Sequence, residues 1–207
     1  MFNLIKHPLI EHKLSIMRDK NTGTKEFREL VAETSSLLFY EATRDLPLTE
    51  ISVETPITTA KTKVIAGHKI AIVALLRAGL GMVDGITSLM PSAKIGHMGL
   101  YRDEHTLEAV KYYIKLPDDI AERDVIIVDP LLATGVTAKY AVKHLKEKGA
   151  KNIKFMCILA APEGKEALET AYPDVEIFCG HLDISLNEQK FIYPGIGDAG
   201  DRIFGTK

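Results

Sequence analysis

The sequence predicts an α/β fold in which helices flank a mostly parallel, twisted sheet. Short apolar runs rich in β-branched residues alternate along the chain with amphipathic segments of helical period, as in parallel sheets covered on both faces. The clearest run, Val125–Val128, ends at Asp129 and Pro130, where proline cannot continue a hydrogen-bonded ladder. Ligands bind such sheets at the carboxyl ends of the strands, so we expect the functional site in the loops there.

Two helices are predicted first, followed by a small β excursion. Residues 9–19 have apolar side chains at helical spacing, and residues 24–44 form the longest helical candidate, with Thr24 as its N-cap. Residues 50–66 change to an alternating pattern around Pro56, which predicts an antiparallel pair of strands.

The rest of the chain alternates between strands and helices. Strands are predicted at Lys69–Leu75, Lys94–Tyr101, Ala109–Lys115, Asp124–Asp129, Ile153–Leu159 and Val175–Cys179. Helices are predicted at Gly81–Leu89, from the loop after Asp129 to Lys148 with Gly149 as its C-cap, and at Lys165–Tyr172. No repeat or linker interrupts the pattern, so we expect one domain over residues 1–207 with a C-terminal binding segment near 180–207.

The composition is that of an ordinary globular chain. Of the 207 residues, 46% are hydrophobic and 26% are charged, and the formal net charge is −2. This balance gives no indication of a nucleic-acid partner. No apolar run approaches the roughly 20 residues of a membrane span, and the N-terminus lacks the pattern of a signal peptide, so we expect a cytoplasmic protein that does not bind membranes. Cys157 and Cys179 lie in apolar runs and are expected to be buried free thiols.

The loop after Val125–Val128 has the character of a phosphate-binding loop. Thr134, Gly135 and Thr137 offer hydroxyls and an unhindered amide just before a helix N-terminus, which favours an anion. Asp129 accepts from ribose hydroxyls, helps to organise a cation or simply terminates the strand. The chain contains no G-x-x-x-x-G-K-[S/T] run, which argues against a P-loop NTPase.

Two arginines follow predicted strands. Arg77 precedes a pair of glycines, and its guanidinium suits a phosphate or a diphosphate, although an ordinary surface arginine is the alternative. Arg102 opens the polar segment 102–108, which is either a mobile flap over a polyphosphate or a solvated charged loop.

A competing pattern lies in the same region. Gly79, Gly81 and Gly85 form a variant of the dinucleotide-binding fingerprint and would indicate an oxidoreductase. The signal is weak because an arginine separates the strand from the glycines, and because the next strand does not end in an acid placed for a ribose.

The C-terminal stretch 191–202 contains three glycines and a proline, which fix an irregular backbone. Amides and carbonyls at fixed positions can read the edge of a flat heterocycle, and Asp198 adds one charged acceptor. A structural turn is the alternative.

These motifs together resemble those of the uracil phosphoribosyltransferases, within the type I phosphoribosyltransferase group. The motifs are Leu76–Gly81 (LRAGLG), Tyr101-Arg102, Val128–Thr137 (VDPLLATGVT), Ala160–Gly164 (AAPEG), Tyr193–Arg202 (YPGIGDAGDR) and Ile203–Lys207 (IFGTK). The match extends over essentially the whole length. The glycine-rich C-terminal motif is the most specific, because it separates uracil enzymes from those that use purines or orotate.

The resemblance implies an enzyme of pyrimidine salvage. It would join uracil to ribose C1 of 5-phosphoribosyl 1-diphosphate (PRPP), giving UMP and diphosphate through an oxocarbenium-like displacement. It also implies Mg²⁺, bound mainly through PRPP, a homodimer or a higher homo-oligomer, and GTP as an activator, as in several bacterial members. The alternative is a nucleotide-sensing RNA-binding regulator on the same fold.

The resemblance also assigns residues. PRPP would be bound by Arg77, Arg102, Asp129, Pro130, Leu131, Leu132, Ala133, Thr134, Gly135, Val136, Thr137 and Asp198. Uracil would be read, largely through the backbone, by Ile192, Gly197, Asp198 and Ala199. Arg102 and Asp198 are the catalytic candidates. Val136 stands where the family usually has glycine, so either the backbone there is ordinarily helical or the loop is shifted.

Overall fold

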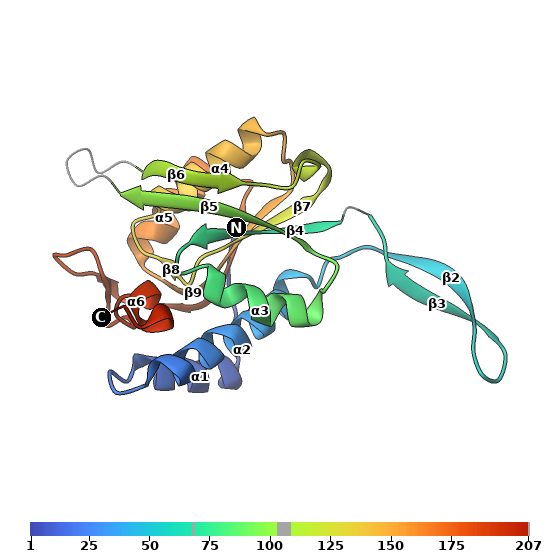
Figure 1. Ribbon diagram of the computed structural model, residues 1–207, viewed down its shortest axis with the longest axis horizontal. Coiled ribbons are helices and arrows are strands. Elements are labelled where there is room, and N and C mark those ends of the chain that lie inside the picture. The colour runs from blue at the N-terminus through green and yellow to red at the C-terminus, as the bar shows by residue number, and fades with distance from the viewer. Residues whose placement is uncertain (68, 103–108, 207) are drawn as a thin grey trace.

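The computed structural model describes residues 1–67, 69–102 and 109–206, with the backbone alone at Tyr101, Arg102 and Ala109. Its central sheet consists of β1 (Phe2–Leu4), β4 (Ile70–Leu76), β5 (Lys94–Arg102), β6 (Ala109–Lys115), β7 (Asp124–Val128), β8 (Leu131–Leu132), β9 (Ile153–Ala160) and β10 (Glu176–Leu182). The strand order is β1-β10-β9-β7-β4-β5-β6, with β8 pairing with β9 (Figure 1). All pairs are parallel except β5–β6, so the predicted mostly parallel sheet is confirmed.

Helices cover both faces of the sheet. They are α1 (Pro8–Arg18), α2 (Thr24–Ala42), α3 (Leu80–Leu89), α4 (Val136–Glu147), α5 (Pro162–Ala171) and α6 (Ala199–Phe204). One apolar cluster joins α1, α2, α3 and α6 to the sheet, and a second joins α4 and α5 to it. Ile126 belongs to the first cluster and Ile127 to the second, as expected for a strand that is buried on both faces.

Two helix ends test the predicted caps. Gly23 is the N-cap of α2 and Thr24 is its first helical residue, so the prediction of Thr24 as the cap is wrong. At the end of α4, Gly149 has φ of +87°, its N–H donates to Lys146 O, and the N–H of Ala150 donates to Leu145 O. These bonds form a Schellman motif, which confirms Gly149 as the glycine that closes the helix.

The shortest elements were not predicted. β1 lies at one edge of the sheet beside β10, η1 (Ile120–Glu122) is a single 3₁₀ turn, and β11 (Ser185–Leu186) pairs with β12 (Ile192–Tyr193). The strand β7 ends at Val128, as predicted from Pro130, but the separate strand β8 after it was not predicted. The carbonyl of Pro130 accepts from the N–H groups of Ile158 and Leu159, both at 3.0 Å, so the chain resumes pairing with β9 directly afterwards.

The predicted β excursion is a hairpin of β2 (Leu48–Glu54) and β3 (Thr59–Ile65), which extends away from the sheet (Figure 1). Its residues are exposed or half-buried throughout, so no face of the hairpin packs on the core. Ile57 at the turn is 94% exposed.

The two cysteines occupy adjacent positions on β10 and β9. Cys179 is the register partner of Cys157, and both are fully buried and free, as predicted. Across the described ranges, no helix is both long enough and apolar enough to cross a membrane.

Candidate active site

The loop between β7 and α4 lies at the carboxyl edge of the sheet and has a geometry suited to an anion. Gly135 is the N-cap of α4 with φ of +76°, a conformation that a side chain would strain. The N–H of Lys139 donates to Gly135 O at 2.9 Å, so the N–H groups of the residues between them have no partner further back in the helix. Thr134 Oγ1 lies 3.5 Å from the N–H of Val136. Amides at the positive end of a helix, with a hydroxyl beside them, can bind a phosphate.

Val136 is the first residue of α4 and has an ordinary backbone. In the described part of the chain, Lys190 is the one residue other than glycine with positive φ. The backbone at Val136 is therefore ordinarily helical, which is the first of the two alternatives that the sequence left open. Its β-branched side chain needs no special backbone geometry.

Helix α5 packs closely against this loop. A Cβ atom at Gly164 would lie 2.4 Å from the carbonyl oxygen of Ala133 and 2.5 Å from that of Leu132. Glu163 accepts from the N–H of Leu186 at 2.9 Å, which ties α5 to β11. The Ala160–Gly164 motif thus helps to fix the position of the loop between β7 and α4.

Asp129 lies at the end of β7 and is half-buried. Its Oδ1 accepts from the N–H of Leu131 at 3.3 Å, a long hydrogen bond that favours the ionised form only weakly. Burial raises the pKa of Asp129 to about 7. Near neutral pH its carboxyl group is therefore divided between the protonated and the ionised form.

A cavity of about 210 Å³ joins Asp129 to the C-terminal segment. Its lining comes from the loops after β4 and β7 and from the segment around β12 and α6, and comprises Ala78, Asp129, Leu131, Ala133, Lys190, Phe191, Ile192, Asp198, Ala199 and Gly200. Some candidates from each set therefore line one cavity: Asp129, Leu131, Ala133 and Asp198 from the PRPP set, and Ile192, Asp198 and Ala199 from the uracil set. The lining does not include Arg77, Thr134–Thr137 or Gly197. Pro130 and Leu132, by contrast, are buried and shape the loop from inside the fold.

Sequence reasoning missed four of these lining residues. They are Ala78, Lys190, Phe191 and Gly200. Position in the sequence could have identified them, since Ala78 and Gly200 lie inside quoted motifs and Lys190 and Phe191 directly precede Ile192. Lys190 also has φ of +66°, which is uncommon for a residue other than glycine.

The C-terminal segment is a sequence of tight turns. Gly195 and Gly197 have φ of +67° and +74°, and the Tyr193–Pro194 peptide bond is cis. Asp198 caps α6, where its side chain accepts from the N–H of Asp201 at 2.9 Å. The predicted irregular backbone is confirmed.

Arg77 directly follows β4, after a cis peptide bond. Its Nη2 lies 3.1 Å from Asp201 Oδ1, and its guanidinium lies 5.9 Å from the ring centroid of Phe204. The side chain is nevertheless 54% exposed. Helix α6 thus orients a guanidinium that a ligand can still reach.

The backbone of Arg102 ends β5, the strand beside β4. Its side chain, and the segment 103–108 interpreted as a flap or a solvated loop, lie outside the described residues.

The glycines of the dinucleotide pattern have packing roles. A Cβ atom at Gly85 would lie 1.9 Å from the carbonyl oxygen of Ala32 in α2, and one at Gly81 would lie 2.9 Å from Cδ1 of Ile203. Close approach between helices accounts for both residues, so the oxidoreductase interpretation loses its support.

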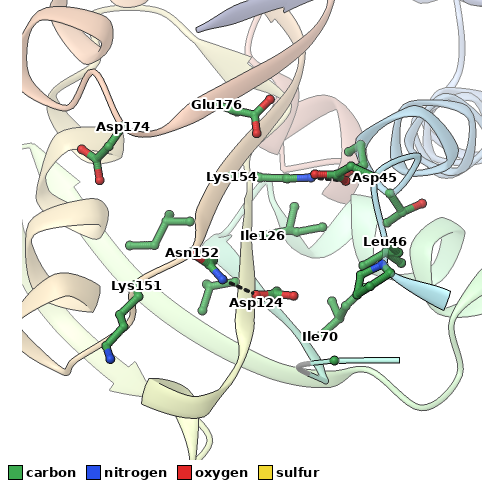
Figure 2. Close-up of a pocket in the computed structure, with 16 residues that line it drawn as sticks. Asp45, Leu46, Ile70, Asp124, Ile126, Lys151, Asn152, Lys154, Asp174 and Glu176 are labelled. Atoms are coloured by element: carbon green, nitrogen blue, oxygen red, sulfur yellow. Dashed lines mark hydrogen bonds and ion pairs between the residues drawn. The ribbon is translucent and has the colours of Figure 1, made fainter. Parts of the chain in front are cut away.

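A larger cleft of about 580 Å³ lies at the opposite, amino edge of the sheet (Figure 2). Lys154 in this cleft donates to Asp45 at 2.6 Å, and Asn152 donates to Asp124 at 2.8 Å. None of the predicted site residues that the structure describes lines it. Its size alone therefore does not make it the active site.

Comparison with known proteins gives consistent results. A family model described as uracil phosphoribosyltransferase matches residues 4–206. A protein of that name from Geobacillus kaustophilus is 62% identical over 201 residues, covering 97% of this chain and 96% of its own length. One of the same name from a Thermoanaerobacter species is 61% identical over 204 residues, covering 99% and 97%.

Solved structures agree on the fold. The AQ2163 protein from Aquifex aeolicus aligns with a TM-score of 0.94 at 37% identity, covering 100% of this chain and 99% of its own. A hypoxanthine-guanine phosphoribosyltransferase from Bacillus anthracis aligns with a TM-score of 0.54 at 18% identity, covering 77% and 80%. The second is a likeness of fold alone.

Proposed function

The chain belongs to the uracil phosphoribosyltransferase family, and on that premise we propose how its residues carry out the transfer. It is a pentosyltransferase that converts uracil and PRPP to UMP and diphosphate. The matched names give no support to the RNA-binding alternative.

The 5-phosphate of PRPP binds at the N-terminus of α4, among residues Thr134–Thr137. The amides that open α4 and the threonine hydroxyls are the donors that a phosphate requires. The ribose then lies toward Asp129, whose carboxyl group accepts from its hydroxyls. The single observation that carries this proposal is the cavity shared by Asp129 and the C-terminal segment.

Uracil binds in that cavity against Ile192 and Gly197–Ala199. Uracil is flat and presents donors and acceptors along one edge, so backbone groups in a rigid turn can distinguish it from other bases. Asp198 faces the same cavity and also contacts the phosphoribosyl group.

The diphosphate leaving group is bound by Arg77 and Arg102. Negative charge grows on the diphosphate as the bond to C1 breaks, and cations aimed at it stabilise the transition state more than the ground state. Arg77 is oriented by Asp201 but remains exposed, which supports this role.

Mg²⁺ fits this site as an ion that arrives largely with PRPP. In the ranges that the structure describes, no three His, Cys, Asp or Glu side chains gather as metal ligands. Asp129 and Asp198 nonetheless line one cavity, and Mg²⁺ commonly binds through one or two carboxylates together with substrate phosphates and water. When bound, it would neutralise charge on the leaving group.

We also propose that the protein is a cytoplasmic homo-oligomer that GTP activates. The apolar side chains on the exposed β2–β3 hairpin support a homodimer or a higher homo-oligomer. Residues 1–207 act as one phosphoribosyltransferase domain. Activation by GTP follows from family membership alone, and the free thiols are in keeping with the reducing cytoplasm.

One assay tests the proposed reaction. Purified protein with uracil, PRPP and Mg²⁺ is expected to form UMP and diphosphate in equal amounts, and no nucleotide with hypoxanthine in place of uracil. Well-folded protein that forms no UMP would contradict the proposal. Adding GTP to the same assay tests activation.

A further inference from the structure

The last turn of α1 binds the loop that contains the proposed uracil contacts. Arg18, the final residue of α1, donates from Nη2 to Asp183 Oδ1 at 2.6 Å and from Nη1 to Asp183 Oδ2 at 3.0 Å. The same Nη1 donates to the carbonyl of Gly195 at 2.9 Å, and Asp183 Oδ2 accepts from the N–H of Gly195 at 2.9 Å. One ion pair therefore satisfies both backbone polar groups of Gly195.

Asp183 depends on these partners because it is buried. Its side chain is 2% exposed, against 25% for Arg18. A carboxylate at such a position needs hydrogen bonds to remain charged, and removing one partner leaves it poorly compensated. His181 also lies near, with Nε2 at 3.6 Å from Asp183 Oδ1 and Nδ1 at 3.1 Å from Glu11 Oε1. The pair and the Gly195 peptide thus form one connected network.

Arg202 anchors the next residue of the loop to the same turn of α1. Its Nη1 donates to the carbonyl of Ile196 at 2.9 Å. Its guanidinium also donates to the carbonyl of Asp19 at 2.6 Å and to that of Met17. Two consecutive loop residues are therefore fixed by arginines that meet at the end of α1.

Gly195 lies against Ile192, one of the proposed uracil contacts, so its position affects the backbone there. A Cβ atom at Gly195 would lie 2.1 Å from the carbonyl oxygen of Ile192, so the two residues are in direct backbone contact. Gly197 follows two residues later. A shift of the Gly195 peptide would therefore move backbone groups on both sides of the proposed uracil position.

We propose that Arg18 and Asp183 are positioning residues for uracil, which fix the Gly195 peptide and through it the base-reading backbone at Ile192 and Gly197–Ala199. This inference rests on the proposed function of that segment. It gives the N-terminal helix a role in base recognition without contact to the substrate. The phosphate loop belongs to α4 and does not share these bonds, so the effect is confined to the base.

The test compares Asp183→Asn with Asp119→Asn as a matched control. Asn at 183 keeps the shape but presents an amide N–H₂ to the guanidinium or to the Gly195 amide. Asp119 forms a similar two-point pair, with Arg123 Nε at 2.8 Å and Nη2 at 2.7 Å, before β7 at the amino edge of the sheet. It does not line the cavity that Asp129 lines.

Two ligands separate base recognition from phosphate binding. For Asp183→Asn we expect KM for uracil and Kd for UMP to rise at least tenfold, while Kd for ribose 5-phosphate changes less than threefold. Asp119→Asn is expected to leave all three constants within threefold. Arg18→Lys keeps the positive charge but replaces the forked guanidinium with a single nitrogen, so KM for uracil and Kd for UMP should rise by a smaller factor. If Asp183→Asn does not fold, Arg18→Lys provides the test.

The outcomes distinguish this inference from the proposed function. If the wild-type protein forms UMP but Asp183→Asn and Arg18→Lys leave the uracil and UMP constants unchanged, the positioning role is wrong. It is also wrong if ribose 5-phosphate binding weakens as much as UMP binding, since that indicates a general structural role. Wild-type protein that forms no UMP would instead overturn the proposed function.

Discussion

Asp129 ends a buried strand and also lines the cavity of the proposed site. As the end of a buried strand it is partly desolvated, and desolvation raises its pKa to about 7. The unfolded chain ionises this group near 3.8, so ionisation above that pH opposes folding. The same desolvation strengthens any hydrogen bond that the carboxylate accepts from a ribose hydroxyl.

Asp129→Asn is predicted to change how stability depends on pH. Between about pH 4 and pH 7 the folded wild-type protein binds more protons at this residue than the unfolded chain does, so its stability falls as pH rises. Relative to Asp129→Asn, the wild-type protein should lose about 2–4 kcal/mol over that range and little more above pH 7. Urea unfolding at a series of pH values measures this. A stability difference that is constant with pH would contradict the raised pKa.

Arg77→Gln is predicted to lower kcat/KM for PRPP by about 10²–10³-fold, because one transition-state donor is worth roughly 3 kcal/mol. Arg44→Gln is the matched control, since Arg44 also pairs with a carboxylate, that of Glu41 at 2.7 Å, and lies over an aromatic ring, that of Tyr40. Steady-state assays should give near-normal rates for Arg44→Gln. Equal rates for the two variants would remove Arg77 from the mechanism.

Candidate site residues could be named from local motifs, whereas their long-range partners could not. The family resemblance assigned Ile192 and Asp198, and both line the cavity, while their roles as ligands stay a prediction. Nothing near Arg18 in the sequence indicates Asp183, which lies 165 positions away. An ion pair of this kind arises from the packing of α1 against the C-terminal segment, and the sequence pattern of either element does not encode it.

At the scale of elements, the packing of α5 fixes the position of the proposed phosphate-binding loop between β7 and α4. Gly164 allows its helix to lie against the carbonyls of Leu132 and Ala133, and no larger residue fits there. The loop is therefore part of a packed layer, and its geometry depends on a helix that contributes no ligand.

Gly164→Ala is predicted to raise KM for PRPP at least tenfold and to lower stability by about 1–3 kcal/mol, because the added Cβ must displace backbone oxygens. Gly23→Ala serves as the control, because nothing lies within 4 Å of its added Cβ, although loss of the glycine cap costs it some stability. Kinetics and thermal unfolding of both variants measure the difference. A normal KM for Gly164→Ala would show that α5 does not determine the loop.

Elements with a clear period were predicted, and those without one were missed. The six longer strands of the sheet and helices α1–α5 followed from apolar runs and helical spacing, whereas the short helix α6 was not predicted. β1, β8, β11 and β12 have two or three residues each, too few to show alternation. Their pairing is decided by neighbours elsewhere in the chain, as for Leu131 beside Leu159.

At the scale of the whole molecule, the β2–β3 hairpin exposes one apolar face. Ile51 and Val53 share a face with Val64, because Ile51 pairs with Thr62 and Val53 with Ala60 in the antiparallel register. These three side chains are 37%, 38% and 41% exposed. An isolated hairpin of this kind is marginally stable in water, which favours burial against a second copy.

The double variant Ile51→Glu with Val53→Glu is predicted to reduce the mass of the assembly to that of a monomer, because burying two carboxylates in an apolar contact is costly. Ser52→Glu, on the opposite face of the same strand, should leave the assembly intact. Sedimentation equilibrium measures all three proteins. A wild-type monomer at micromolar concentration, or an unchanged double variant, would contradict the role of the hairpin.

The central claim is that the α4 N-terminus and the C-terminal segment bind two ends of one nucleotide. A crystal structure with UMP tests it most directly. We expect the phosphate within hydrogen-bond distance of the N–H groups of Val136 and Thr137, and the uracil edge hydrogen-bonded to the backbone of Ile192 and Gly197–Ala199. UMP bound in the cleft of Figure 2, or with its base directed away from that segment, would contradict the claim.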